Sequence, residues 1–242
     1  MKIQTLLASL LVSGAAMAQT PTIKPIVMKT PNEFQILAAS GNGKWACGVY
    51  SDYSNVQYGF LWNLETGEIE MLDPSKPSVA WSVSDDGLVV GQYEDTSYKS
   101  NGAAVELAGY WANGKWNRFE MPSDEVSGAG AASISPDGHY VTGHVEESGI
   151  YTGYIWKDGK IAKELINTNC SMPYAIAPDG QSAAGWIQRD NRTACIWEAD
   201  GEVTFLSDYQ SPWSSARKYT HDGKNLLYWG GWDDMEAENA SV

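Results

Sequence analysis

Hydrophobic and polar residues follow a pattern that returns about every 45 residues along this chain. Each unit begins with small or apolar residues and then reaches a polar turn that is usually Asp-Gly. A short apolar run ending in glycine follows, then a run ending in tryptophan, a glycine turn and a last apolar run. Copies lie at 38–48, 81–91, 132–143 and 174–185, and a degraded fifth copy starts at Arg217.

The third copy shows most clearly which elements this pattern predicts. Apolar or alternating segments at 129–135, 139–145, 151–156 and 160–166 are separated by glycine turns or a short loop. Four short antiparallel strands with such turns are typical of one blade of a β-propeller. We therefore predict an all-β protein, a propeller of about five four-stranded blades that start near residues 34, 78, 129, 171 and 214.

The two ends of the repeat array do not match. The fifth copy supports two strands between Ser214 and Tyr228 and then gives way to an acidic tail. Before the first copy, Thr22–Lys29 resembles the fourth strand of a blade. We predict that this N-terminal strand closes the last blade, which would remove exposed sheet edges. The alternative, an incomplete fragment of a larger propeller, stays open.

Residues 1–18 have the features of a signal peptide. Lys2 is followed by an apolar stretch at 3–12, and Ala16-Met17-Ala18 forms a small-x-small cleavage site. The propeller domain is therefore expected over 19–242, in a protein exported to the periplasm or the extracellular space. The sequence predicts no transmembrane segment.

Composition narrows the classes of partner. The formal net charge is −14, and nucleic-acid binding needs a basic surface, so no nucleic-acid partner is expected. The three cysteines are too few for a disulfide framework. Cys47 and Cys195 lie in apolar strand patterns and are predicted to be buried, with a Cys170–Cys195 bridge as the alternative.

Tryptophan and aspartate recur at fixed positions of the repeat. We interpret the tryptophans as wedges between neighbouring blades, and the aspartates as caps of their own turns. The tryptophans are Trp62, Trp111, Trp156 and Trp197, and the aspartates are Asp86, Asp137, Asp179 and Asp222.

Two motifs carry a family resemblance. Val89-Val90-Gly91 and Phe60-Leu61-Trp62 resemble the HAF-type extracellular repeat, and the turn Ser135-Pro136-Asp137-Gly138 resembles that of TolB-like propellers. The resemblance covers about 35–230. It implies an extracytoplasmic propeller scaffold, mostly one that binds proteins, and no particular activity.

Acidic and aromatic residues gather where the loops opposite the Asp-Gly turns are expected. We take ten of them as candidate ligand-binding residues: Trp81, Tyr93, Tyr174, Trp186, Trp213, Asp52, Glu94, Asp95, Glu146 and Asp190. Aromatic rings stack on sugars, and carboxylates bind hydroxyl groups, basic protein segments or Ca²⁺. No cofactor is required, although Ca²⁺ would suit this rim. The alternative reading is a solvated acidic surface.

Signals for catalysis are weak. The expected innermost strands carry no Asp or Glu, so the acid pair of a glycoside hydrolase is not indicated. His144 with Glu146 and Glu147 is the one local cluster with metal-binding chemistry. We therefore predict a non-enzymatic binding module or scaffold for an envelope protein or a glycan. A propeller-type glycoside hydrolase using Asp52, Glu94 and Asp190 is the alternative, and a purely structural role stays open.

Overall fold

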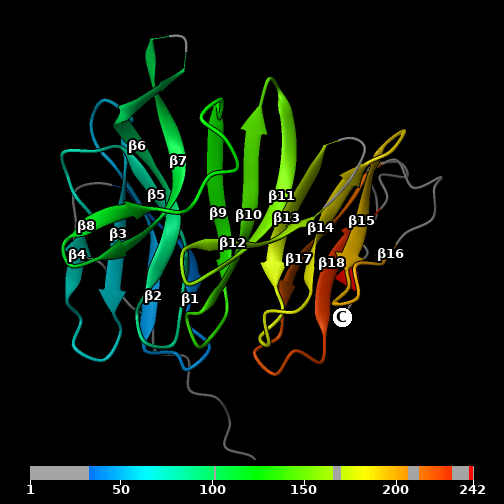
Figure 1. Cartoon of the computed structure of the whole chain (residues 1–242). Coiled ribbons are helices and arrows are strands. Elements are labelled where there is room, and N and C mark those ends of the chain that lie inside the picture. The colour runs from blue at the N-terminus through cyan, green and yellow to red at the C-terminus, as the bar shows by residue number, and fades with distance from the viewer. Residues whose placement is uncertain (1–32, 101, 166–169, 207–212, 231–239, 242) are drawn as a thin grey trace, which may run out of the picture. The chain divides into compact units, whose positions relative to one another are not determined.

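The computed structural model describes residues 33–100, 102–165, 170–206, 213–230 and 240–241. In these residues every regular element is a strand (Figure 1). None of them forms a helix long and apolar enough to cross a membrane. The predicted signal peptide and the predicted strand at 22–29 lie outside the described residues.

The strands form five antiparallel sheets, taken in chain order. The first sheet holds β1 (Glu33–Ala39), β2 (Trp45–Ser51), β3 (Gln57–Asn63) and β4 (Ile69–Met71). The second holds β5 (Ser78–Val83), β6 (Val89–Ser100), β7 (Ala103–Ala112) and β8 (Lys115–Arg118). The third holds β9 (Gly128–Ile134), β10 (Tyr140–Glu147), β11 (Ile150–Lys157) and β12 (Lys160–Leu165).

The last two sheets complete the described array. The fourth holds β13 (Ser171–Ile176), β14 (Ala183–Gln188), β15 (Arg192–Trp197) and β16 (Val203–Phe205). The fifth has three strands, β17 (Ser214–Tyr219), β18 (Leu226–Gly230) and β19 (Ala240–Ser241). In every sheet the strands pair in sequence order, so each sheet is a simple meander.

The first strands of neighbouring sheets contact one another. β1 meets β5, β5 meets β9, β9 meets β13, and β13 meets β17. These strands therefore form the inner side of the array, and the later strands of each sheet extend outward. An all-β chain of successive four-stranded meanders packed in this way has the architecture of propeller blades, as predicted.

The third copy folds almost as its pattern indicates, because each observed strand bound lies within two residues of its predicted value. The fifth copy forms β17 and β18 as expected. It also pairs β18 with the two-residue strand β19, which the sequence analysis did not predict. An element of two residues is too short to show alternation.

A glycine of the repeat marks a close approach between the first two strands of a sheet. A Cβ on Gly91 would lie 1.8 Å from the carbonyl oxygen of Val79, and a Cβ on Gly143 would lie 2.0 Å from that of Gly130. Gly48 and Gly185 are in the same situation. The second glycine of the repeat is therefore required by a backbone contact, since no side chain fits there.

The repeated tryptophans pack toward the preceding sheet. Trp156 is fully buried, and its Nε1–H donates to the carbonyl of Glu120 at 2.8 Å. Trp197 belongs to a buried cluster with Ile155 of the third sheet. Trp111 donates to a carboxylate oxygen of Glu70 in the first sheet at 2.9 Å. These contacts confirm the wedge interpretation for three of the four tryptophans, and the fourth, Trp62, is buried as well.

A buried serine at the start of an inner strand links three pairs of sheets. The hydroxyl of Ser78 accepts the N–H of Gly59, that of Ser171 accepts the N–H of Gly153, and that of Ser214 accepts the N–H of Ala194, at 2.7–3.0 Å. In each case the donor is on the third strand of the preceding sheet. The bond satisfies a buried backbone group at the sheet–sheet junction.

The cysteines are free thiols, so the alternative Cys170–Cys195 bridge is not formed. Cys47 and Cys195 are buried, as predicted. Burial raises the pKa of the Cys47 thiol to about 12, and it raises that of Cys195 further. Both side chains therefore behave as small apolar groups of the core.

Candidate functional site

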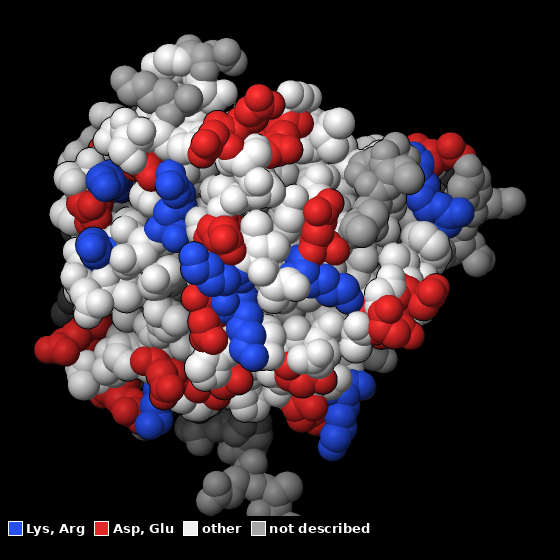
Figure 2. All heavy atoms as spheres, viewed as in Figure 1, with Lys and Arg blue, Asp and Glu red and all other residues white. Residues whose placement is uncertain are grey.

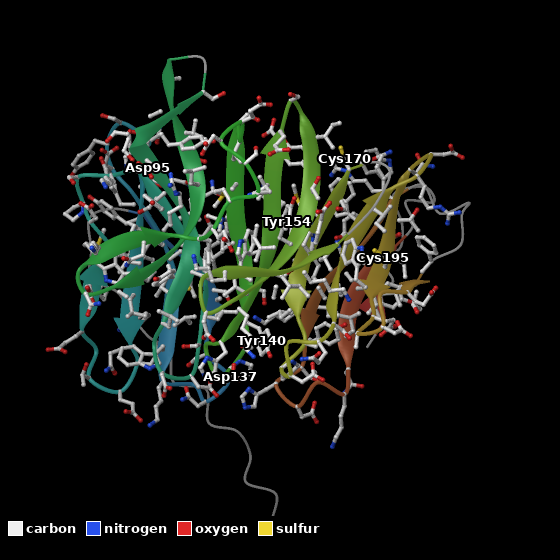
Figure 3. All side chains as sticks on the ribbon, in the orientation of Figure 1. Asp95, Asp137, Tyr140, Tyr154, Cys170 and Cys195 are labelled. Atoms are coloured by element: carbon white, nitrogen blue, oxygen red, sulfur yellow. The ribbon has the colours of Figure 1, made fainter. Side chains whose placement is uncertain are left out.

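The two ends of the strands carry different groups of residues. Asp137 and Tyr140 lie at the end where first and second strands are joined, and Asp95 and Cys170 lie toward the other end (Figure 3). We call the first the turn end and the second the loop end. The two groups of acidic residues were predicted to lie at opposite ends, and Asp137 and Asp95 do so.

Each inner strand contains one unpaired residue in its ladder with the second strand. The register skips Leu37, Trp81, Ala132, Tyr174 and Arg217. Such a bulge changes the direction of one side chain and is frequent beside functional sites. The structure thus presents five equivalent positions on the inner side, and three of them hold large aromatic or cationic groups.

Aromatic and arginine side chains of the fourth and fifth sheets form a continuous chain of contacts. The guanidinium carbon of Arg217 lies 4.3 Å from the ring centre of Tyr174. The hydroxyl of Tyr174 accepts the Nε1–H of Trp186 at 3.3 Å. Arg192 lies 4.5 Å from the ring of Trp186 and 5.0 Å from that of Trp213. We call these five residues the arginine–aromatic array.

The array unites three predicted residues with two that the sequence analysis missed. Tyr174, Trp186 and Trp213 were expected to be anchors, and the structure connects them through Arg192 and Arg217. Trp186 is buried at 4% exposure, whereas 44% of Trp213 is exposed. One signal was available for Arg217, since it occupies the position that holds Leu37, Trp81, Ala132 or Tyr174 in the other copies.

Trp81 occupies a separate polar network in the second and third sheets. Its indole is 40% exposed and donates to Oε1 of Gln92 at 3.1 Å, and Gln92 donates to Glu106 at 2.6 Å. A Cβ on Gly130 would lie within 3.1 Å of both Gln92 and His144, so glycine leaves the space that these two side chains fill. Glu94 pairs with Glu106 in the β6–β7 ladder.

His144 is a neutral packing residue in this network. Burial lowers its pKa to about 4, and its ring contacts Tyr151 edge-on at 5.4 Å between centres. Among the residues that the structure describes, no three His, Cys, Asp or Glu side chains gather in an arrangement that could hold a metal ion. The proposed combination of His144 with Glu146 and Glu147 is therefore not assembled as a metal cluster.

Tyr93 and Asp95 form a structural pair beside the second sheet. Tyr93 is 4% exposed and stacks on Trp116, with ring centres 5.5 Å apart. Its hydroxyl donates to Asp95, which also accepts two bonds from Ser97 and lies 3.8 Å from Arg118. Partial burial acts to raise the pKa of Asp95, but these hydrogen bonds and the Arg118 charge lower it overall.

The remaining predicted acids belong to the loops of their own sheets. Asp52 accepts the backbone N–H groups of Ser54 and Val56, so it caps the β2–β3 loop. Glu146 is a strand residue of β10 that pairs with Tyr151. Asp190 is exposed in the β14–β15 loop, two residues before Arg192 of the array.

Figure 2 shows acidic groups at the upper and lower edges of one face, with basic residues mostly between them.

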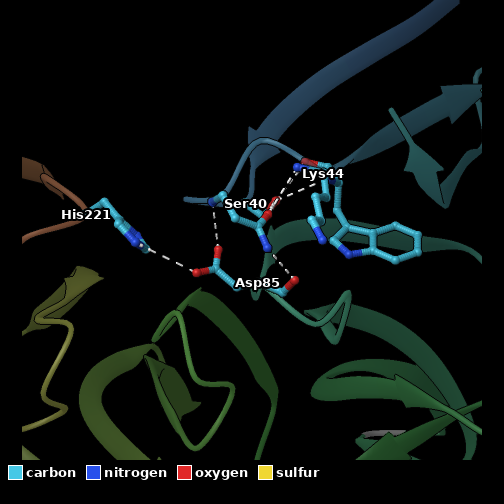
Figure 4. Close-up of polar contacts among 6 residues, drawn as sticks. Ser40, Lys44, Asp85 and His221 are labelled. Atoms are coloured by element: carbon cyan, nitrogen blue, oxygen red, sulfur yellow. Dashed lines mark hydrogen bonds and ion pairs between the residues drawn. The ribbon is translucent and has the colours of Figure 1, made fainter. Parts of the chain in front are cut away.

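At the turn end, residues from three sheets meet (Figure 4). Asp85 accepts the backbone N–H of Asn42 at 2.9 Å, and its carboxylate lies 3.8 Å from Nε2 of His221. The His221 ring covers Gly41 so closely that a Cβ there would lie 1.9 Å from Nδ1. The fifth sheet therefore reaches the first and second sheets at this end.

The turn aspartates act as caps in three of the four predicted cases. Asp137, Asp179 and Asp222 each accept the N–H of the residue two positions later, at 3.0–3.1 Å. The fourth predicted cap was Asp86 of the second sheet. There it is the preceding residue, Asp85, that accepts hydrogen bonds, both of them from Asn42. These acids have structural partners, which leaves the loop end as the place for a ligand.

A groove of about 430 Å³ lies between the second and third sheets. Its lining includes Tyr98, Tyr110, Arg118, Glu120 and Lys160. The two basic side chains of this lining lie close to carboxylates, since Arg118 lies 3.8 Å from Asp95, and Lys160 lies 4.0 Å from Glu120. The groove therefore lacks an unpaired basic group of the kind that Arg192 and Arg217 provide in the array.

Comparison with known proteins gives similarity in structure alone. No protein-family model matches the chain, and no curated protein matches it. TolB from Acinetobacter baumannii is 17% identical with a TM-score of 0.49, over 82% of this chain and 51% of that one. A putative TolB from Agrobacterium tumefaciens is 16% identical with a TM-score of 0.49, over 70% and 63%. An acylaminoacyl peptidase from Pyrococcus horikoshii is 11% identical with a TM-score of 0.48, over 84% and 36%.

This chain thus spans less than two thirds of each of these structures. The assignment of propeller blades rests on the strand order and sheet contacts described above. TolB proteins are thus among the solved structures found. The HAF-type resemblance stays a prediction.

Proposed function

We propose that the protein is an exported, non-enzymatic propeller module that binds an envelope protein or a glycan at its loop end. The observation that carries this proposal is the arginine–aromatic array, in which exposed Trp213 lies beside Arg192, and Arg217 lies over Tyr174. Ligand sites combine aromatic surface with a few fixed polar groups, and the array has this composition.

The acids of the rim support binding rather than catalysis. Asp52 caps its own loop and Asp95 is held by Ser97, Tyr93 and Arg118. A glycoside hydrolase needs two carboxyl groups facing each other across the scissile bond. The described inner-strand positions at the bulges hold Leu37, Trp81, Ala132, Tyr174 and Arg217, none of which is an acid.

A thermal-shift panel tests the proposal. The protein is melted alone, with Ca²⁺, with EDTA and with neutral and acidic glycans and envelope extracts, because a ligand of the folded state raises the Tm. We expect at least one glycan or envelope component to raise the Tm, and Trp213→Ala to abolish the rise. Ile69→Ala, an exposed apolar residue of the outermost strand β4, is the matched control. A rise that survives Trp213→Ala would contradict the proposed site.

A further inference from the structure

Arginine is concentrated in one part of this acidic chain. The protein has four arginines, and Arg189, Arg192 and Arg217 all belong to the fourth and fifth sheets or their loops. Each lies over an aromatic ring at 4.3–4.5 Å, on Phe205, Trp186 and Tyr174 respectively. The fourth arginine, Arg118, has Asp95 beside it. The stacked arginines therefore form a local cationic region in a chain with a formal net charge of −14.

Arg192 is held in place by rings rather than by a carboxylate. Its guanidinium carbon lies within 5.0 Å of the ring centres of both Trp186 and Trp213, and its side chain is exposed. In the described part of the chain, neither Arg192 nor Arg217 forms an ion pair. Stacking on a ring engages the face of a guanidinium, so the N–H groups at its edges stay available for hydrogen bonds. A planar fork fixed in this way is suited to a carboxylate, which it binds through two parallel hydrogen bonds.

The charge of the whole protein limits what kind of anion fits. A polyanion approaching this surface would be repelled by the surrounding acids. A single carboxylate on an otherwise neutral ligand meets little of that repulsion, because exposed charges are screened within about 8–10 Å at physiological salt. The Arg192 cation and the negative charge of the surrounding protein together favour a ligand with a single carboxylate.

Trp213 supplies the second half of the recognition. Its indole is 44% exposed beside Arg192, so it offers a flat apolar face next to an anion-binding fork. The C–H face of a pyranose ring is also flat and apolar, and a uronic acid carries one carboxylate at its edge. We propose that the arginine–aromatic array binds a saccharide that contains uronic acid, with the sugar on Trp213 and its carboxylate on Arg192.

This inference rests on the proposed function, and its test separates the two. Titration calorimetry with the full chain compares an aldotriouronic acid, which carries a single carboxylate, with its methyl ester and with an end-capped hexapeptide that contains one glutamate. We expect the acid saccharide to bind at least tenfold more tightly than the ester, because a charge-assisted hydrogen bond is lost in the ester. Arg192→Gln should weaken binding of the acid by about tenfold to a hundredfold and leave the ester unchanged.

Two further variants complete the design. Arg192→Lys keeps the charge but loses the planar fork. We therefore expect its loss of log affinity for the acid to be more than half of the loss in Arg192→Gln. Lys44→Gln removes one exposed cation at the turn end and should change the affinity less than twofold. Unchanged Tm values confirm that the variants fold.

Each outcome distinguishes the uronic-acid inference from the proposed function. If the acid and the ester bind equally and Trp213→Ala abolishes both, carboxylate recognition is overturned. The proposed function is then still supported. Binding of the peptide but not of the saccharide overturns the sugar class. Binding of none of the probes also overturns the inference, and the glycan and envelope panel then decides on the proposed function separately.

Discussion

The third and fifth sheets are copies of one repeat that differ at two equivalent positions. In the third sheet the bulge position holds Ala132 and the close approach is made by Gly143. In the fifth, Arg217 takes the bulge position and Tyr228 stands where the other copies have glycine, opposite Ala216. The two sheets also bury tryptophan differently. Trp156 on the third strand of the third sheet is fully buried, whereas Trp229 on the second strand of the fifth sheet is only partly buried.

This comparison separates the demands of packing from those of the proposed binding site. The third sheet has a neighbouring described sheet on both sides, and its repeat keeps the small and apolar residues that such packing requires. The fifth sheet departs from the repeat and contributes Arg217 to the arginine–aromatic array. A degraded copy therefore marks the part of the fold where a different chemistry has replaced tight packing.

The largest expected effect comes from the tryptophan wedge. Trp156→Ala should lower the free energy of unfolding by about 4 kcal/mol, because it leaves a cavity and deprives the Glu120 carbonyl of its donor. Trp229→Ala in the fifth sheet should cost about 1–2 kcal/mol, since that ring is only partly buried. Urea unfolding curves measure both. Equal losses would show that the two sheets are packed alike.

The close approach at the second glycine gives the next effect. Gly143→Ala should cost about 3 kcal/mol, because the new Cβ would lie 2.0 Å from a backbone oxygen that has no freedom to move. Gly128→Ala in the same sheet is the matched control. Its Cβ would lie 3.2 Å from the end of the Glu146 side chain, which can rotate away, so the expected change is below about 1 kcal/mol. A tolerated Gly143→Ala would contradict the proposed reason for the repeat glycine.

The sequence predicted the blades of this fold because their signals are local. Asp-Gly turns, alternating apolar residues and the tryptophan at the end of each third strand all lie within one copy of the repeat. The strand bounds of the third sheet follow from them. The two-residue strand β19 gave no such signal, because it depends on its pairing with β18.

The candidate site was predicted in part. Tyr174, Trp186 and Trp213 were chosen as exposed aromatics near the loop end, and contacts connect all three. Arg192 and Arg217 were missed because their importance arises from rings on other strands, which a single sequence does not place side by side. Tyr93 was grouped with the rim for its position beside Asp95, but its ring faces Trp116 in the core.

We predict that two histidines of the third sheet change the stability of the protein with pH in opposite directions. Burial depresses the pKa of His144 to about 4, below the value of about 6.5 in the unfolded chain. Between these values the unfolded state binds the proton and the folded state does not, so stability falls as the pH drops through this window. His144 should account for about 2–3 kcal/mol of that loss.

Comparison with His144→Gln isolates this contribution from the titration of acidic residues. Unfolding free energies are measured at pH 7 and pH 4, and the variant should lose less stability than the unmodified protein. His139 has its pKa raised by the hydrogen bond and charge of Asp158, so its contribution is present at low pH and fades as the pH rises. His139→Gln should therefore change the pH dependence in the opposite direction. The same direction for both variants would refute the assignment.

The smallest expected effect concerns the place where the fifth sheet meets the first two. Asp85→Ala removes the acceptor of the Asn42 N–H and the carboxylate beside His221 (Figure 4), and it should cost about 1 kcal/mol. Asp85→Asn keeps an oxygen that accepts the Asn42 N–H, so it should lower the free energy of unfolding by less. It loses only the carboxylate that lies 3.8 Å from His221, and that contact is exposed. Asp179→Ala, which removes a cap confined to one turn, is the control. If hydrogen exchange in β17 and β18 increases in Asp85→Ala but not in Asp179→Ala, the turn end is what fastens the divergent sheet to the regular ones. Equal exchange in the two variants would leave the fifth sheet held by its contacts with the fourth alone.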